Sequence, residues 1–247
     1  MNVFAESKMR LLVIMILASL SLCNPAGAEP TAQSGEIHCE PEKAVQNQDS
    51  AKLEAKCLAQ MNGLASRNGD ELRLVLASGK IKSLLSNHRA CDDNDADKCL
   101  MYRLSAYYPA QQLFVIEADQ YESYSVAAVS ASTGATTLMD DHPHLSPSGK
   151  RLAVAFSSEA WETKRDIAIY TIENGMLRLE WSYKAKDYEQ WEFAGWDGDD
   201  RVKLRVTSRL TDSAGKEDLA TRDADVRRTD AGWRLRKPTN AKPKRGA

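Results

Sequence analysis

The sequence lacks the short motifs that mark many enzymes. It has no G-x-S-x-G nucleophile elbow, no G-x-G-x-x-G turn and no phosphate-binding P-loop. Nothing therefore indicates an elbow-type serine hydrolase or a bound cofactor. Paired carboxylates that meet only in the folded chain leave no such motif, so a hydrolase stays open as an alternative.

An excess of positive charge is also missing. The 33 Lys and Arg residues are balanced by 35 Asp and Glu residues, which gives a formal net charge of −2. Nucleic-acid binding depends on a basic surface that neutralises phosphates. We therefore expect no nucleic-acid partner.

Long apolar runs are absent after the first 28 residues. The one strong run, Leu11–Leu22, follows Lys8 and Arg10 and precedes the small residues Ala26-Gly27-Ala28. This order is typical of a secretory signal peptide, and the run is short for a bilayer span. We predict a signal peptide over 1–28 and a periplasmic or secreted chain that does not span a membrane. Lipidation at Cys23 is the alternative, although the bulky Leu22 before it fits that processing poorly.

Cysteines are few, and four remain after residue 28: Cys39, Cys57, Cys91 and Cys99. An even number in an exported chain favours disulfides over free thiols or metal ligands. Of the three possible pairings, proximity in the sequence favours Cys39–Cys57 and Cys91–Cys99.

The segment 29–62 is predicted to carry a short helix. Its apolar side chains are spaced to lie on one helical face, and Gly63 follows as a stop. A Cys39–Cys57 disulfide would tether this helix as a cap on the following domain. The basic tail, 237–247, has no apolar anchor, and we expect it to be disordered and solvated.

From residue 63 the apolar period changes to two, and glycine-marked hairpins recur. One recurring pattern places a turn glycine at Gly79, Gly134, Gly175 and Gly232. A second recurring pattern, interleaved with the first, places the first apolar residue of a strand at Leu72, Leu113, Leu152 and Val202. Repeats of roughly 40–50 residues built from strand pairs are typical of propeller blades.

One of these repeats carries a resemblance to a known family. The stretch His144-Leu145-Ser146-Pro147-Ser148-Gly149-Lys150-Arg151-Leu152-Ala153-Val154 resembles the S-P-D-G-K-x-[IL]-A blade motif of TolB-like β-propellers of the bacterial envelope, with Ser148 in place of Asp. The resemblance implies an all-β fold over 63–236: a propeller or incomplete propeller of about four antiparallel β-meander blades. The first blade is expected to be one strand short, and an open stack of hairpins is the alternative to a closed ring.

Two groups of residues have spacings that suggest metal ligands. Asp93, Asp95 and Asp97 show the D-x-D-x-D spacing of calcium loops, but Lys98 and Leu104 stand where such loops need Gly and Glu. His142 and His144 alternate along a strand entry and could share one face, although two ligands leave a zinc site incomplete. We favour a solvated acidic loop for the first group and a connection between blades for the second.

The aromatic residues are few, and most of them are predicted to pack between blades. Trp161, Tyr121 and Tyr124 are the candidates for an interaction surface, Trp161 because it lies in a polar connection. The sequence as a whole favours a non-catalytic binding or scaffolding module of the cell envelope, with an envelope protein or glycan as partner. The alternative is an exported hydrolase that uses carboxylates or a metal at His142 and His144.

Overall fold

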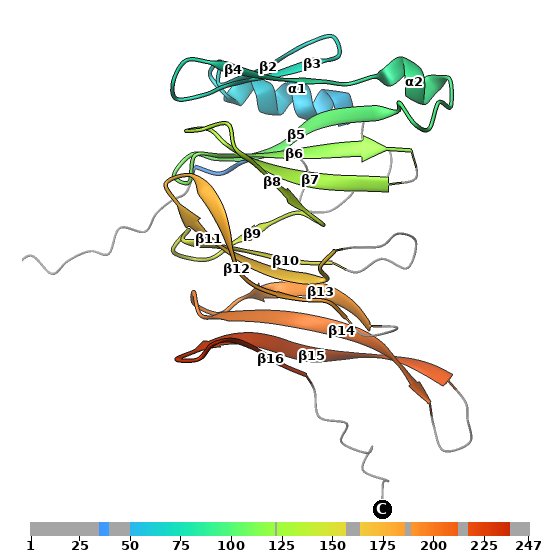
Figure 1. The fold of residues 1–247 in the computed structure, drawn as a ribbon, viewed down its shortest axis with the longest axis vertical. Helices are drawn as coiled ribbons and strands as arrows, with labels where there is room; N and C mark the ends of the chain where they lie inside the picture. Colours follow the sequence, from blue (N-terminus) through green and yellow to red (C-terminus); the bar gives the residue numbers. More distant parts are fainter. Residues whose placement is uncertain are drawn as a thin grey trace, which may run out of the picture. The chain divides into compact units, whose positions relative to one another are not determined.

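The computed structural model of the protein describes residues 35–39, 50–121, 123–156, 164–185, 189–211 and 217–237 (Figure 1). All of them lie in the second of the two compact units into which the chain divides, Gln33–Ala247. The expected signal peptide, Cys23, Trp161 and the tail beyond Lys237 lie outside the described residues.

The described strands form four antiparallel sheets. The first sheet is a three-stranded meander of β2 (Ala65–Asn68), β3 (Glu71–Val75) and β4 (Ile81–Leu85). The second sheet has the order β1-β5-β6-β7-β8, with β1 (Ile37–His38), β5 (Leu100–Tyr108), β6 (Leu113–Gln120), β7 (Ser123–Ser130) and β8 (Thr136–Met139).

The third and fourth sheets are four-stranded meanders. The third contains β9 (His144–Leu145), β10 (Arg151–Ala155), β11 (Ile167–Glu173) and β12 (Met176–Tyr183). The fourth contains β13 (Glu189–Trp196), β14 (Arg201–Thr211), β15 (Glu217–Thr229) and β16 (Gly232–Arg236). The all-β prediction and the glycine-marked hairpins are confirmed, and the first meander is one strand short as expected.

The turn glycines explain why these hairpins form where they do. Gly79, Gly134, Gly175 and Gly232 all have positive φ. A side chain disfavours this conformation, so glycine fixes the place where the chain reverses. The β11–β12 turn lies close to the β7–β8 turn, because a Cβ added at Gly175 would lie 2.9 Å from Ser132 Oγ.

Each sheet packs on the next one along the chain through a buried apolar layer. In β6, Phe114 and Ile116 belong to the layer shared with the first sheet, while Leu113 and Val115 belong to the layer shared with the third. This division follows from the alternation of side chains along a strand. In β10, Leu152 and Ala153 divide in the same way between the second and fourth sheets. Strand β10 and the first half of β11 are therefore buried on both faces, whereas no residue of β12 is buried.

Helix α1 (Ser50–Gln60) completes the first of these layers. Cys57 and Met61 are buried in it beside Leu72 and Leu104, and the Cys39–Cys57 disulfide ties the helix to the chain next to β1. The Cys91–Cys99 disulfide is also present. The structure thus contains a tethered helix and both of the favoured disulfides.

Two features depart from the expectation. A second helix, α2 (His88–Asp92), lies in the segment expected to be only a loop, and Asn87 caps it by accepting a hydrogen bond from the Ala90 N–H group. Strand β1 adds to the edge of the second sheet, with Ile37 opposite Tyr107. The ring is not closed, which agrees with the open alternative: none of the apolar layers among the described residues joins the first sheet to the fourth.

Candidate functional site

The segment between β8 and β9 carries residues 140–143, and one side of it meets a buried charged cluster. Arg103 on β5 and Glu117 on β6 are cross-strand neighbours, and Arg103 Nε donates to a Glu117 carboxylate oxygen at 2.8 Å. The other carboxylate oxygen lies 2.7 Å from His142 Nε2. Only 2% of the Glu117 surface is exposed, so its charge depends on these two partners.

The electrostatics of this cluster favour an ionised glutamate. Burial alone would raise the pKa of Glu117, but the hydrogen bond from His142 and the positive charge of Arg103 lower it below its ordinary value. Burial raises the pKa of the neighbouring Asp119. Tyr124 donates a hydrogen bond to Asp141, and burial together with that carboxylate raises the pKa of the phenol.

Ser105 extends the cluster toward a serine, histidine and acid arrangement. Ser105 lies where the register of β5 and β6 shifts, and such bulges often re-aim a side chain. Its Oγ lies 3.3 Å from His142 Nδ1, on the side of the imidazole opposite Glu117. Ser105 is only 5% exposed, however, and Arg103 shares the carboxylate. The arrangement is closed to a substrate and is best explained as a support for the β8–β9 connection.

A pocket opens on the other side of the same connection. Its volume is about 350 Å³. Three edge strands contribute to it: β1 of the second sheet, β9 of the third and β13 of the fourth. The lining residues are Glu36, His38, Tyr108, Pro143, His144, Leu145, Pro147, Phe193 and Trp196. We call this the aromatic pocket.

The rings of the aromatic pocket are held in place by stacking and by hydrogen bonds. The His144 and Phe193 rings are stacked, with their centroids 3.8 Å apart and their planes 4° from parallel. Trp196 Nε1 donates to the His144 carbonyl at 3.0 Å, and the Tyr108 hydroxyl donates to the Pro143 carbonyl at 3.2 Å. Burial lowers the pKa of His144 to about 4, so its imidazole is neutral at neutral pH. The pocket therefore presents fixed, uncharged rings.

Glu36 and His38 supply the polar atoms of the aromatic pocket. His38 Nε2 lies 3.0 Å from Glu36 Oε2, and the His38 ring meets Tyr108 edge to face with centroids 5.9 Å apart. Ligand pockets commonly combine many apolar groups with a few such polar atoms, which fix the orientation of the ligand.

The two histidines considered as candidate metal ligands, His142 and His144, have different partners. His142 contacts Glu117 and Ser105, whereas His144 stacks on Phe193. Within the part of the chain that is described, no group of three or more His, Cys, Asp or Glu side chains is arranged to hold a metal ion. The zinc hypothesis therefore gains no third ligand from these residues.

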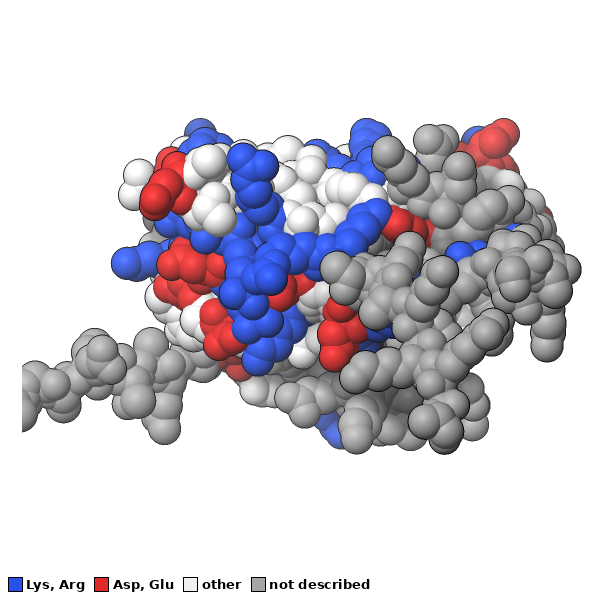
Figure 2. Space-filling view, turned by 90° about the horizontal axis from the view of Figure 1, so that it is seen from below, with Lys and Arg blue, Asp and Glu red and all other residues white. Residues whose placement is uncertain are grey.

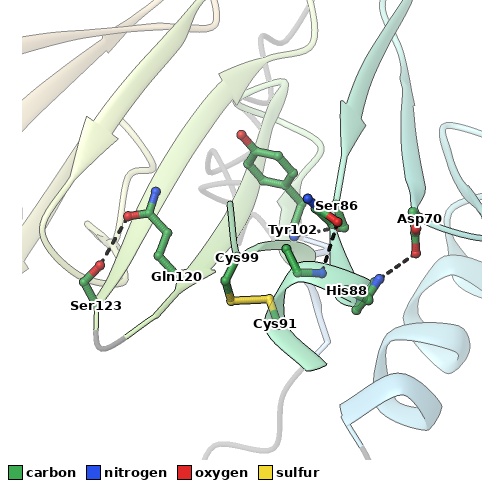
Figure 3. Close-up of a disulfide and its surroundings, with 10 residues drawn as sticks. Asp70, Ser86, His88, Cys91, Cys99, Tyr102, Gln120 and Ser123 are labelled. Carbon is green, nitrogen blue, oxygen red and sulfur yellow. Dashed lines mark hydrogen bonds and ion pairs between the residues drawn. A yellow bond between two sulfur atoms is a disulfide. The ribbon is translucent and has the colours of Figure 1, made fainter. Parts of the chain in front are cut away.

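The acidic segment whose spacing resembles a calcium loop lies beside the Cys91–Cys99 disulfide. Figure 3 shows this disulfide joining the end of α2 to the start of β5, with His88 paired to Asp70 at 2.6 Å. Asp93 lies 3.5 Å from Arg89, and Asp95 lies 2.7 Å from Lys98. Asp97 is exposed. Two of the three carboxylates in this segment thus pair with basic side chains.

The aromatic residues predicted for an interaction surface are dispersed. Tyr121 is 46% exposed next to the β6–β7 turn, Tyr124 is half-buried against Asp141, and Trp161 lies outside the described residues. The sequence did not single out Phe193 and Trp196 as a site. The sequence signal closest to them is the turn Asp197-Gly198-Asp199-Asp200, which precedes the strand anchor Val202.

No protein family, curated protein or solved structure matches the chain. Among the described helices, none is long and apolar enough to cross a bilayer.

Proposed function

We propose that the protein is an exported, non-catalytic binding module of the bacterial cell envelope, and that its ligand occupies the aromatic pocket. The observation that carries this proposal is the meeting of edge strands from three successive sheets around one set of rings. In propellers, the edge strands on one side of the blades surround the central channel. An open, incomplete propeller of the TolB-like kind would expose that side to a ligand, and the blade motif at residues 144–154 supports this architecture.

The chemistry of the aromatic pocket fits a sugar ring of an envelope glycan. Flat rings at His144, Phe193 and Trp196 offer apolar faces to the C–H face of a sugar. Glu36 and His38 can exchange hydrogen bonds with its hydroxyl groups. The two disulfides support export, because disulfides persist in oxidising compartments.

Co-sedimentation with purified cell-wall glycan tests the proposal. We expect the wild-type protein to pellet with the glycan, and we expect Phe193→Ala and Glu36→Gln to weaken binding at least tenfold, which corresponds to about 1.4 kcal/mol. Tyr121→Ala is the matched control, because it removes an exposed ring outside the pocket. Thermal melting checks that each variant is folded. Equal binding by the wild type and both pocket variants would refute the assignment of the site.

A metal-dependent hydrolase is the second candidate, because His142 and Glu117, whose Nε2 and Oε1 atoms lie 2.7 Å apart, are two side chains of the kinds that bind zinc. A chelator tests the metal-dependent form of this hypothesis. A fall in melting temperature on chelation, together with metal in the purified protein, would support it. An unchanged melting temperature would count against it.

A further inference from the structure

The outer face of the fourth sheet carries a dense set of cations. The inner face of this sheet packs against the third sheet through Trp191, Val202, Leu204 and Val226. The alternate residues of the same strands point the other way, and basic side chains predominate among them over the middle of the face that Figure 2 shows. This local excess contrasts with the net charge of −2 for the whole chain.

Three arginines stand directly opposite one another on adjacent strands. Arg201 on β14 pairs with Arg227 on β15, and Arg227 pairs with Arg234 on β16. We call them the arginine row. Like charges directly opposite one another destabilise a sheet, so this row opposes folding rather than assisting it. A face that tolerates such a row is suited to an anionic partner.

The acidic side chains around the arginine row neutralise it only in part. Asp225 lies 2.9 Å from Arg201 and 2.8 Å from Arg227, and Asp197 lies 2.9 Å from Arg201. Arg234 and the neighbouring Arg236 are exposed, and neither has an ion-pair partner among the described residues. These two arginines are therefore available to a ligand.

The net positive charge of each cross-strand row decreases with distance from the arginine row. In the next row, Lys203, Asp225 and Arg236 lie opposite one another. A hollow of about 460 Å³ opens here, lined in part by Arg201, Lys203, Arg236 and the two aspartates Asp223 and Asp225. One row further, Arg205 lies between Glu192 and Asp223. Counted over β14, β15 and β16 alone, the formal charges of the three rows are +3, +1 and 0, so the positive charge is concentrated at the arginine row.

We propose that this face docks on a membrane surface of anionic lipids, with the arginine row, Lys203 and Arg236 contacting lipid phosphates. Clusters of about 4–8 Lys and Arg residues are typical of anionic-lipid binding. The charges extend in two dimensions over three strands, which matches a planar array of phosphates better than a single polymer strand. A protein interface would place aromatic anchors at its centre, and the three rows contain none.

Flotation with vesicles tests the proposal. We expect the wild-type protein to float with vesicles of phosphatidylglycerol and phosphatidylcholine, and not with vesicles of phosphatidylcholine alone. The double variant Arg234→Gln/Arg236→Gln should bind about 25-fold more weakly, from about fivefold for each cation lost. Raising the salt from ~0.1 to ~0.5 M should also release the protein, because screening shortens the reach of surface charges.

The double variant Lys56→Gln/Lys80→Gln is the matched control. It removes the same charge from exposed positions on α1 and the β3–β4 turn, and it should float like the wild type. Arg234→Lys/Arg236→Lys should retain binding, and melting curves verify that each variant is folded. Three results would each overturn the proposal: equal loss in the control, wild-type flotation by Arg234→Gln/Arg236→Gln, or binding to a soluble polyanion such as heparin without binding to vesicles.

Discussion

The first and last apolar layers of the described residues reach stability by different means. The first layer lies beside short strands of four or five residues and is completed by α1, the Cys39–Cys57 disulfide and a charged pair. The last layer lies beside strands of up to 13 residues and is completed by Trp191 and Trp233. Short strands bury little apolar surface, so we expect the first layer to depend more strongly than the last on its disulfide and its charged pair.

Glu54 is the centre of those polar links. Its carboxylate accepts hydrogen bonds from Arg67 Nε on β2 at 2.6 Å and from the Leu104 N–H group on β5 at 2.8 Å. One side chain of the helix thus joins the first two sheets.

Replacing Glu54 should have the largest effect on this comparison. We expect Glu54→Ala to lower the free energy of unfolding by about 4 kcal/mol, because it leaves the largely buried Arg67 charge and a buried N–H group without their acceptor. Urea unfolding measures the loss. Glu54→Gln keeps one acceptor oxygen and should lose less. A loss below about 1 kcal/mol for Glu54→Ala would show that the first layer does not depend on this pair.

Removing the Cys39–Cys57 disulfide should have the next largest effect. Cys39→Ser/Cys57→Ser frees a loop of sequence separation 18, and loop-closure entropy gives a loss of about 3 kcal/mol. The Cys91–Cys99 disulfide closes a separation of only 8, so Cys91→Ser/Cys99→Ser should cost about 0.7 kcal/mol less. Urea unfolding of both double variants tests this order. The reverse order would mean that the first layer does not rely on its own disulfide.

The smallest expected effect belongs to His144 and appears as a pH dependence. Its folded pKa of about 4 lies below the ordinary value of 6.5, so the unfolded chain binds a proton that the folded chain excludes. This contribution is complete above pH 6.5 and is lost as the pH falls toward 4, by up to about 1 kcal/mol per pH unit.

His144→Phe isolates this contribution, because it keeps a ring against Phe193 without a titrating group. Urea unfolding of both proteins between pH 4 and 6.5 gives the comparison. The wild type should lose stability faster than the variant as the pH falls. Parallel curves would show that the imidazole is not shielded where the third and fourth sheets meet.

Local patterns in the sequence were enough to predict the hairpins. Gly79 and Gly175 mark turns whose positive φ glycine adopts readily, and the alternating leucines around Leu72 fall in β3 as predicted. The helix α2 was missed because its five residues are too few to show a helical period. The short β1 was missed because its pairing with β5 spans about 70 residues of sequence, from Ile37 to Tyr107.

The candidate sites depend on register, which single-sequence patterns do not contain. Arg103 meets Glu117 only because β5 and β6 pair in one particular register, and the arginine row exists for the same reason. The net charge is a sum over the whole chain, so it gives no indication that the three arginines of the arginine row lie side by side. His142 and His144 share one segment, but the distant residues Glu117 and Phe193 decide the surroundings of each.

Each apolar layer is shared only by two neighbouring sheets, and this arrangement affects how the protein unfolds. Because no layer among the described residues spans the first and the fourth sheet, either terminal meander can detach while the others stay intact. Amide protons should therefore exchange first at the two ends of the stack and last in β6 and β10, which lie between two neighbours. The molecule should therefore unfold locally from its two terminal sheets, whereas a closed propeller has no terminal sheet.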